Sequence, residues 1–260
     1  MSSALATARK SSPRATHTEH RVEVDGVSVR YIEAGHDNPG PPVVLVHGFL
    51  VGADLWYPHT FPAIAERFHV YALDLPGFGE SGELPDYGLA AYGRFMAAFL
   101  DRLGLDSIQL VGHSMGGQIA VATSAHCPER VQRLVLICSA GMPRISMGWA
   151  APLLILADRS TFDVALYPQI IRLMLQSRGR RPCLKMINEE SVYPMLHRLT
   201  MPTLVVWGSR DRVVPLEYAT LFARNIPQAR LAIMRGCGHR PFYQKPALFN
   251  KILFGFLKAE

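Results

Sequence analysis

The chain has 260 residues and a mass of 28.8 kDa, which fits one large domain or two small ones. Hydrophobic residues make up 49% of it and charged residues 18%, which is enough for a buried core and excludes a disordered chain. No run of about 18 apolar residues occurs, so the sequence predicts no membrane-spanning helix.

The net charge of +6 comes from the first 20 residues and from the second half of the chain. The densest basic cluster consists of Arg178, Arg180, Arg181 and Lys185. No zinc-finger, basic-zipper or RNA-recognition motif accompanies this cluster. We therefore expect a solvated basic surface or a contact with an anionic partner such as a lipid surface, and no nucleic-acid binding.

The N-terminal segment, residues 1–20, is rich in Ser, Ala and Thr and contains several basic residues. This composition overlaps with that of organelle transit peptides, but we favour a disordered tail. The four cysteines have no C-x-x-C spacing, so we expect free thiols in the reducing cytoplasm. The ten histidines are scattered and no H-E-x-x-H motif occurs, so we expect no metal site.

After residue 20, short apolar runs alternate with longer runs of helical spacing. Two alternating runs around Asp25-Gly26 predict a hairpin over 22–32. Wholly apolar runs predict strands that are buried on both faces. Strands are predicted at 43–46, 68–73, 108–111, 134–137, 203–207 and 231–234, and helices at 89–103, 115–125, 216–224 and 246–257. The alternation indicates an α/β core of residues 21–140 and 201–260, with a parallel sheet covered by helices on both faces.

Residues 141–200 interrupt this alternation. Five prolines punctuate the segment, and its apolar runs have helical spacing. We expect an inserted helical lid, and the simpler interpretation of its apolar side chains is that they form the core of the lid. The functional alternative is that Trp149, Leu153 and Met174 line an apolar pocket for an acyl group under it.

Ser114 lies in a G-H-S-M-G sequence at 112–116, after a predicted buried strand and at the start of a predicted helix. A G-x-S-x-G in this setting is typical of a nucleophile elbow, where a strained turn exposes the hydroxyl above the sheet. The helix N-terminus there favours developing negative charge. We expect Ser114 to be a catalytic nucleophile; the alternative is a glycine-rich turn with an incidental serine.

A serine needs a base, because its hydroxyl is a weak nucleophile at neutral pH. His239 is the expected base, since it lies between glycine and proline on a loop after the last predicted strand. For the nine other histidines, in the tail, at strand ends or in elements, we expect structural roles.

Asp211 follows the strand at 203–207 and is expected to orient His239. The chain order serine, aspartate, histidine is the order found in hydrolases with a nucleophile elbow. A surface ion pair with a neighbouring arginine is the alternative. Asp74 also ends a predicted strand, and we expect this carboxylate to brace a loop.

Acyl transfer also needs hydrogen-bond donors for the developing oxyanion. The main-chain N–H of Met115, directly after the serine, is one expected donor. The N–H of Phe49 is the other, because Gly48 lets the loop after the strand at 43–46 approach closely.

Together these motifs resemble the α/β-hydrolase superfamily over about residues 22–258. The resemblance implies a mostly parallel eight-stranded sheet, a lid after the sixth strand, and a Ser-His-Asp triad without metal or organic cofactor. Serine at position 114 argues against haloalkane dehalogenases and epoxide hydrolases, which carry aspartate there. The matching sequences are H-G-F at 47–49, D-L-P-G-F-G-E-S at 74–81, G-H-S-M-G-G at 112–117, W-G-S-R-D at 207–211 and G-H-R-P at 238–241.

Three functions fit this resemblance. The first is hydrolysis of a small-molecule carboxylic ester with an apolar acyl group, because G-H-S-M-G-G resembles carboxylesterases and monoacylglycerol lipases. The second is carbon–carbon bond hydrolysis of a ring-cleavage product, ranked lower because those enzymes often carry Asn where His113 stands. The third is a hydrolase-fold receptor, against which the complete triad argues. Gln244 replaces the usual Glu of the last motif, which we treat as a small change in a supporting contact.

Overall fold

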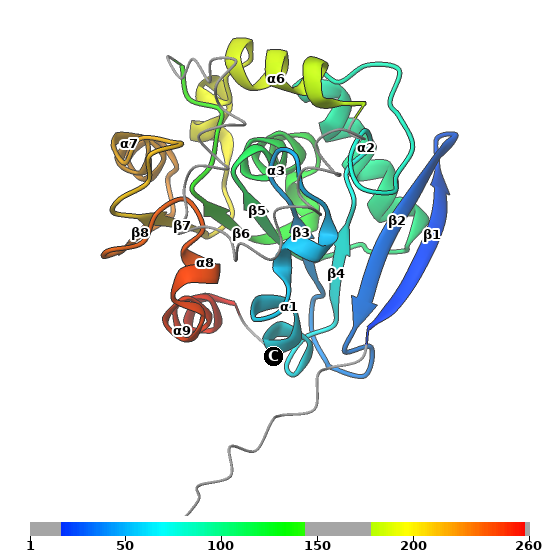
Figure 1. The fold of residues 1–260 in the computed structure, drawn as a ribbon, viewed down its shortest axis with the longest axis horizontal. Helices are drawn as coiled ribbons and strands as arrows, with labels where there is room; N and C mark the ends of the chain where they lie inside the picture. The colour runs from blue at the N-terminus through cyan, green and yellow to red at the C-terminus, as the bar shows by residue number, and fades with distance from the viewer. Residues whose placement is uncertain (1–16, 144–177, 258–260) are drawn as a thin grey trace, which may run out of the picture.

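The computed structural model describes residues 17–143 and 178–257, which fold around one eight-stranded sheet (Figure 1). The strand order is β1-β2-β4-β3-β5-β6-β7-β8. β2 pairs antiparallel with β1 and with β4, and all the other pairings are parallel. The expected mostly parallel sheet is therefore confirmed. The strands are β1 (Thr18–Val24), β2 (Val27–Ala34), β3 (Val43–Val46), β4 (Val70–Leu73), β5 (Ile108–His113), β6 (Val131–Ile137), β7 (Thr203–Gly208) and β8 (Ala229–Met234).

Helices cover both faces of the sheet, as expected. From β3 to β4 the chain moves one way along the sheet, and from β4 to β5 and onward it moves the other way. Because parallel crossovers are right-handed, α1 lies on one face, and α2, α3 and α7 lie on the other. α9 packs beside α1, where the rings of Phe68 and Phe254 are stacked. The helices are α1 (Thr60–Ala65), α2 (Leu89–Arg102), α3 (Met115–His126), α7 (Glu217–Asn225), α8 (Pro241–Gln244) and α9 (Pro246–Phe256).

Burial follows from this layering. β3, β4, β5 and β7 are buried at every position, which explains their wholly apolar or nearly apolar sequences. β1 and β8 form the two edges and keep exposed residues. The short helices α1 and α8 and the 3₁₀ turn η1 (Ala53–Trp56) were not predicted, because they are too short to show a helical period.

The tail is shorter than predicted. β1 begins at Thr18, so residues 18–20, which we expected in the disordered tail, pair with residues 31–33 of β2. The prediction was wrong here because the start of this edge strand is polar and exposed, so it carries no apolar alternation.

Part of the predicted lid segment is described, and it is helical: α6 (Arg180–Glu189) and the 3₁₀ helix η4 (Tyr193–Arg198). Glu190, at the end of α6, accepts a hydrogen bond from the N–H of Leu89 (2.9 Å) and, at its carbonyl, one from Gln118 (2.7 Å). Leu89 and Gln118 lie in the first turns of α2 and α3. The end of α6 therefore lies at the carboxyl end of the parallel strands, where Ser114 is also found. Trp149, Leu153 and Met174 lie outside the described residues.

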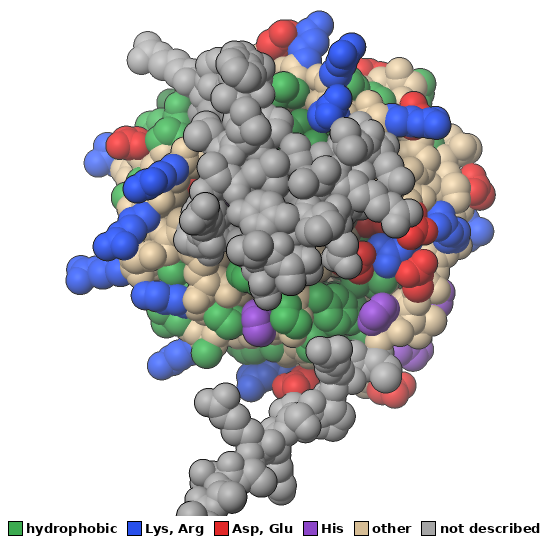
Figure 2. Space-filling view, viewed as in Figure 1, with side chains coloured by type: hydrophobic (Ala, Val, Ile, Leu, Met, Phe, Trp, Pro, Cys, Tyr) green, Lys and Arg blue, Asp and Glu red, His purple; other side chains and the backbone are tan. Residues whose placement is uncertain are grey.

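The basic excess of the C-terminal quarter is spread along one side of the molecule. Figure 2 shows Lys and Arg side chains along the left side, where Figure 1 places α7 and β8. In the part of the chain that the structure describes, no helix combines the length and apolar character that crossing a membrane requires. The exposed basic residues of this quarter are Arg210, Arg212, Arg224, Arg230, Arg235, Lys245 and Lys251.

Candidate active site

The turn between β5 and α3 has the geometry of a nucleophile elbow. Ser114 is the single residue between β5 and α3. Its backbone angles, φ 55° and ψ −119°, are a strained conformation for a residue with a side chain. Only glycine fits at position 116, since a Cβ there would collide with the main-chain oxygens of Val46 and His47. The elbow therefore packs directly against the end of β3.

The structure brings together the three side chains that the sequence singled out. Oγ of Ser114 lies 3.0 Å from Nε2 of His239, and Nδ1 of His239 lies 2.8 Å from Oδ2 of Asp211. The three residues follow the carboxyl ends of β5, β8 and β7, which meet at one edge of the sheet. His239 is 3% exposed, so water is largely excluded from the imidazole.

The carboxylate of Asp211 is held in a fixed orientation. Its Oδ1 accepts hydrogen bonds from the N–H groups of Val213 (2.8 Å) and Val214 (2.9 Å), which leaves Oδ2 facing His239. The thiol of Cys138 also lies close, with Sγ within 4.8 Å of the Asp211 and His239 ligand atoms. Burial, and secondly the charge of Asp211, hold the pKa of Cys138 well above its usual range, so the thiol stays neutral. Cys138, the residue directly after β6, was not singled out from the sequence because no motif surrounds it.

The loop that carries His239 has two supporting hydrogen bonds. Oε1 of Gln244 accepts from the N–H of Gly238 (2.6 Å), so glutamine provides a supporting contact at this position. Nε2 of His113 lies 2.9 Å from the carbonyl oxygen of His239. Burial, and secondly the charge of His239, lower the pKa of His113 well below its usual value. His113 is thus neutral, and Nε2 carries the proton that it donates.

The loop after β3 lies against the serine. A Cβ added to Gly48 would be 3.1 Å from Cβ of Ser114 and 3.0 Å from Nδ1 of His113, so glycine allows this close approach. Within residues 17–143 and 178–257, no acceptor pairs with the main-chain N–H of Phe49 or of Met115. Met115 is the first residue of α3, where the N–H groups have no partner within the helix. Both amides are therefore available near Ser114.

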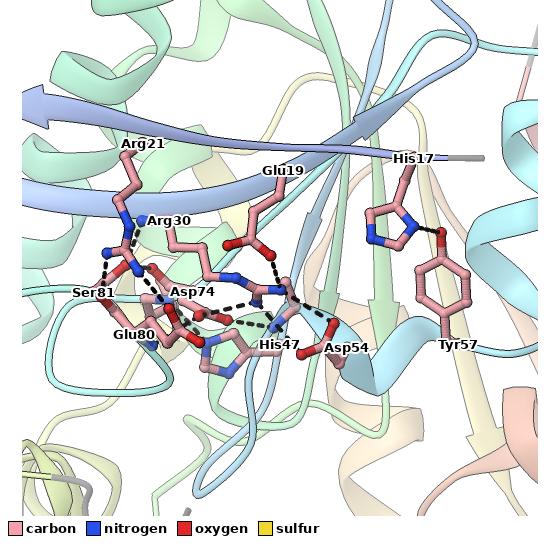
Figure 3. Close-up of polar contacts among 12 residues, drawn as sticks. His17, Glu19, Arg21, Arg30, His47, Asp54, Tyr57, Asp74, Glu80 and Ser81 are labelled. Atoms are coloured by element: carbon pink, nitrogen blue, oxygen red, sulfur yellow. Dashed lines mark hydrogen bonds and ion pairs between the residues drawn. The ribbon is translucent and has the colours of Figure 1, made fainter.

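Asp74 connects this loop to the loop after β4, as Figure 3 shows. The buried carboxylate accepts hydrogen bonds from the N–H groups of Ala53 (2.6 Å) and Glu80 (2.9 Å). Nη1 of Arg30 lies 3.3 Å from its Oδ2. The expected loop-bracing role of Asp74 is confirmed.

Arg30 and His47 complete this support (Figure 3). The buried guanidinium of Arg30 also reaches Glu19 (2.8 Å) and Asp54 (3.4 Å), so one cation serves three carboxylates. Nε2 of His47 accepts from the N–H of Leu75 (2.9 Å), which leaves the proton on Nδ1, 2.7 Å from the carbonyl oxygen of Gly48. Burial lowers the pKa of His47, in agreement with a neutral ring.

This arrangement has the parts that acyl transfer requires. A hydroxyl contacts an imidazole, a carboxylate orients the imidazole, and the N–H groups of Phe49 and Met115 have no acceptor among the described residues. Fold and site together define a hydrolase. The chain belongs to the alpha/beta hydrolase fold family, which it matches over residues 41–169 and 170–246.

Relatives and solved structures show what the chain is similar to. It is 32% identical over 268 aligned residues to the dihydrolipoyllysine-residue acetyltransferase component of an acetoin cleaving system from Pseudomonas putida, covering 92% of this chain and 69% of that one. A membrane phospholipase A, described as a bacterial virulence factor, has a TM-score of 0.83 at 29% identity, with coverage of 92% and 85%. A meta-cleavage product hydrolase from Pseudomonas fluorescens IP01 has a TM-score of 0.80 at 26% identity, with coverage of 91% and 96%.

Proposed function

We propose that this protein hydrolyses a carboxylic ester through an acyl-enzyme on Ser114. The observation that carries the proposal is the continuous hydrogen-bonded series from Ser114 Oγ through the His239 ring to Asp211, with distances of 3.0 and 2.8 Å. Such a series makes the hydroxyl nucleophilic, because the imidazole takes its proton as the new bond forms.

Acylation begins when Ser114 Oγ attacks the carbonyl carbon and its proton passes to Nε2 of His239. Asp211 stabilises the resulting imidazolium, and the N–H groups of Phe49 and Met115 hold the oxyanion of the tetrahedral intermediate. When the intermediate collapses, the carbon–oxygen bond to the alcohol breaks, and the alcohol leaves with the proton from His239.

Deacylation repeats these steps with water as the nucleophile. His239 takes a proton from the water, the water oxygen bonds to the acyl carbon, and Ser114 Oγ leaves with the proton from the imidazolium. The carboxylic acid is released, and no metal or organic cofactor takes part in the proposed reaction.

Similarity supports an ester as the substrate. The chain resembles a membrane phospholipase A with 29% identity across most of both chains, and phospholipases A cleave carboxylic esters of lipids. An apolar acyl group on a small-molecule ester is therefore the proposed substrate class. The basic cluster of the lid segment supports a transient contact with an anionic lipid surface as part of the same proposal; it consists of Arg178, Arg180, Arg181 and Lys185.

Carbon–carbon bond hydrolysis is the second candidate. It is supported by the similarity to the meta-cleavage product hydrolase, at 26% identity and a TM-score of 0.80. Its substrates are vinylogous diketones, in which the attacked carbon is a ketone rather than an ester carbonyl. His113, beside Ser114, argues against this candidate, because carbon–carbon bond hydrolases often carry Asn at that position.

A comparison of kcat/KM between esters and a diketone separates the two candidate functions. We would measure kcat/KM for p-nitrophenyl esters from acetate to palmitate and for a 2-hydroxy-6-oxo-dienoate, with Ser114→Ala as the control for uncatalysed loss. Ester hydrolysis predicts a preferred acyl length with kcat/KM well above that for the diketone. A diketone preference would replace the first proposal with the second, and no turnover of either class would contradict both.

A further inference from the structure

A cluster of imidazoles and one carboxylate lies away from Ser114, at the other end of the sheet. Oε1 of Glu33 is 2.7 Å from Nε2 of His69 and 3.7 Å from Nδ1 of His36. The three ligand atoms all lie within 4.8 Å of one another. On the far side of the carboxylate, Oε2 of Glu33 is 3.3 Å from Nε2 of His20.

The pleat of the sheet explains this convergence. In the antiparallel register His20 lies opposite Tyr31, and Glu33 lies opposite Tyr71. Tyr31 and Glu33 are two positions apart on β2, and His69 precedes Tyr71 by two positions, so these side chains share one face of the sheet. The turn after β2 adds His36 to the same group.

We propose that Glu33, His36 and His69 form a binding site for a divalent transition-metal ion, with Zn²⁺ as the preferred ion. Two imidazole nitrogens and one carboxylate oxygen are donors that zinc accepts, with water completing its coordination. Zinc–ligand bonds of about 2.0–2.2 Å place tetrahedral donors about 3.3 Å apart, which lies between the two measured distances. Small side-chain rotations bring the donors to that spacing.

Two of the three proposed ligands are held in place by packing, and the third is free to rotate. The side chains of Glu33 and His69 are only 18% and 14% exposed, and the ring of His69 packs on Tyr71 with centroids 4.5 Å apart. His36 is 81% exposed, so its ring can turn toward an ion without disturbing the core. His20 is stacked on Tyr31 and holds the second oxygen of Glu33, which is the kind of outer contact that orients a ligating carboxylate.

The position of the site predicts a structural effect. The ion would connect the end of β2 to the start of β4, at the amino end of the parallel strands, whereas Ser114 follows the carboxyl end of β5. Binding therefore raises the thermal stability of the fold and leaves the hydrolytic site untouched, since an ion that binds only the folded state stabilises it by mass action.

Titration with ZnCl₂ alone tests the proposal. Calorimetry of the full chain is expected to give one zinc ion per chain and a zinc-dependent rise in Tm. His36→Ala removes an exposed ligand without a packing cost and abolishes both effects, as does His69→Gln. His20→Gln weakens binding by about 10- to 100-fold, as loss of an outer contact does. His59→Ala, which removes an exposed histidine outside the cluster, is the matched control and leaves binding unchanged.

Two results would overturn the proposal. One is the absence of zinc binding by the wild type, and the other is equal binding by the wild type and the His36→Ala/His69→Gln variant. The second result would mean that zinc binds only adventitiously elsewhere. Neither result depends on which substrate the enzyme cleaves, so the metal site and the proposed hydrolysis stand or fall separately.

Discussion

The ring of His113 donates a hydrogen bond to the carbonyl oxygen of His239 over 2.9 Å, although the two residues are 126 positions apart. The residue before the nucleophile thereby holds the loop that delivers the base. Their rings are also close, with centroids 4.8 Å apart.

This contact makes His113 a positioning residue for the proposed reaction. His113→Leu removes the donor, and we expect kcat to fall about 10-fold with little change in KM, the scale of one lost buried hydrogen bond. His113→Gln places a side-chain NH₂ at about the reach of the imidazole Nε2, so it keeps the donor and should retain most of the activity. The measurement is steady-state kcat and KM of the two variants and the wild type, with circular dichroism to verify that each variant is folded. Equal losses in both variants would show that ring packing, not the hydrogen bond, matters.

The buried histidines also make stability depend on pH. Burial lowers the pKa of His47 and His113, whereas both rings protonate near pH 6.5 in the unfolded chain. Below pH 6.5 the unfolded state therefore binds more protons, so the free energy of unfolding falls as the pH falls. The loss is at most about 1.4 kcal/mol per pH unit for each histidine, and the slope fades over about one pH unit above 6.5.

Urea unfolding between pH 7.5 and 5.5 measures this slope. His113→Asn should reduce the slope below pH 6.5, because one of the two buried bases is then absent. A slope identical to that of the wild type would mean that His113 does take up a proton in the folded state.

Asp74 should affect catalysis through the loop that carries Phe49. Asp74→Asn leaves a single acceptor oxygen where the carboxylate meets Ala53, Glu80 and Arg30, so at least one contact is lost. Breaking one partner of a buried ion pair typically costs about 3–5 kcal/mol of stability. We expect kcat to fall as well, by up to the 10²–10³ that loss of one oxyanion donor causes.

The affinity for a trifluoromethyl ketone distinguishes this effect from loss of folded protein. Its oxyanion adduct needs the same N–H groups, so its Ki should rise in parallel with the loss of kcat. Asp54→Asn is the matched control, because Asp54 contacts the same guanidinium but its side chain is 70% exposed. An unchanged Ki in Asp74→Asn would remove the loop from the mechanism.

Asp211→Asn should impair the base without moving it. Val213 and Val214 donate to one side-chain oxygen, so an asparagine there would turn its NH₂ group toward Nδ1 of His239. The ring would then carry its proton on Nε2 and could not accept one from Ser114. Rates about 10⁴-fold lower are expected, as in other serine triads. An unchanged rate would assign the acid to another carboxylate.

The sequence predicted most of the site, because its parts are local motifs in a fixed order. G-H-S-M-G after a buried strand was enough to locate Ser114, and the loops after later strands gave Asp211 and His239. Strands buried on both faces were found because helices on each side require apolar residues throughout. The start of β1 was missed because it is an exposed edge, where apolar residues are not required.

Contacts made across the sheet could not be predicted in this way. Arg30 lies in a strand, and nothing in its neighbourhood in sequence indicates that it serves three carboxylates. Glu33, His36 and His69 meet only through the register of β2 with β4, so the scattered histidines gave no metal motif. Cys138 approaches Asp211 for the same reason, since parallel strands bring distant positions together.

The most direct test of the proposed reaction is to find the acyl group. The enzyme is mixed with p-nitrophenyl butyrate, quenched in acid within milliseconds, digested, and analysed by mass spectrometry. We predict a butyryl group on Ser114, no such peptide in Ser114→Ala, and a fall in kcat of about 10⁶ in that variant, the scale of other serine triads. An acyl group on a different residue, or near wild-type turnover by Ser114→Ala, would contradict the account.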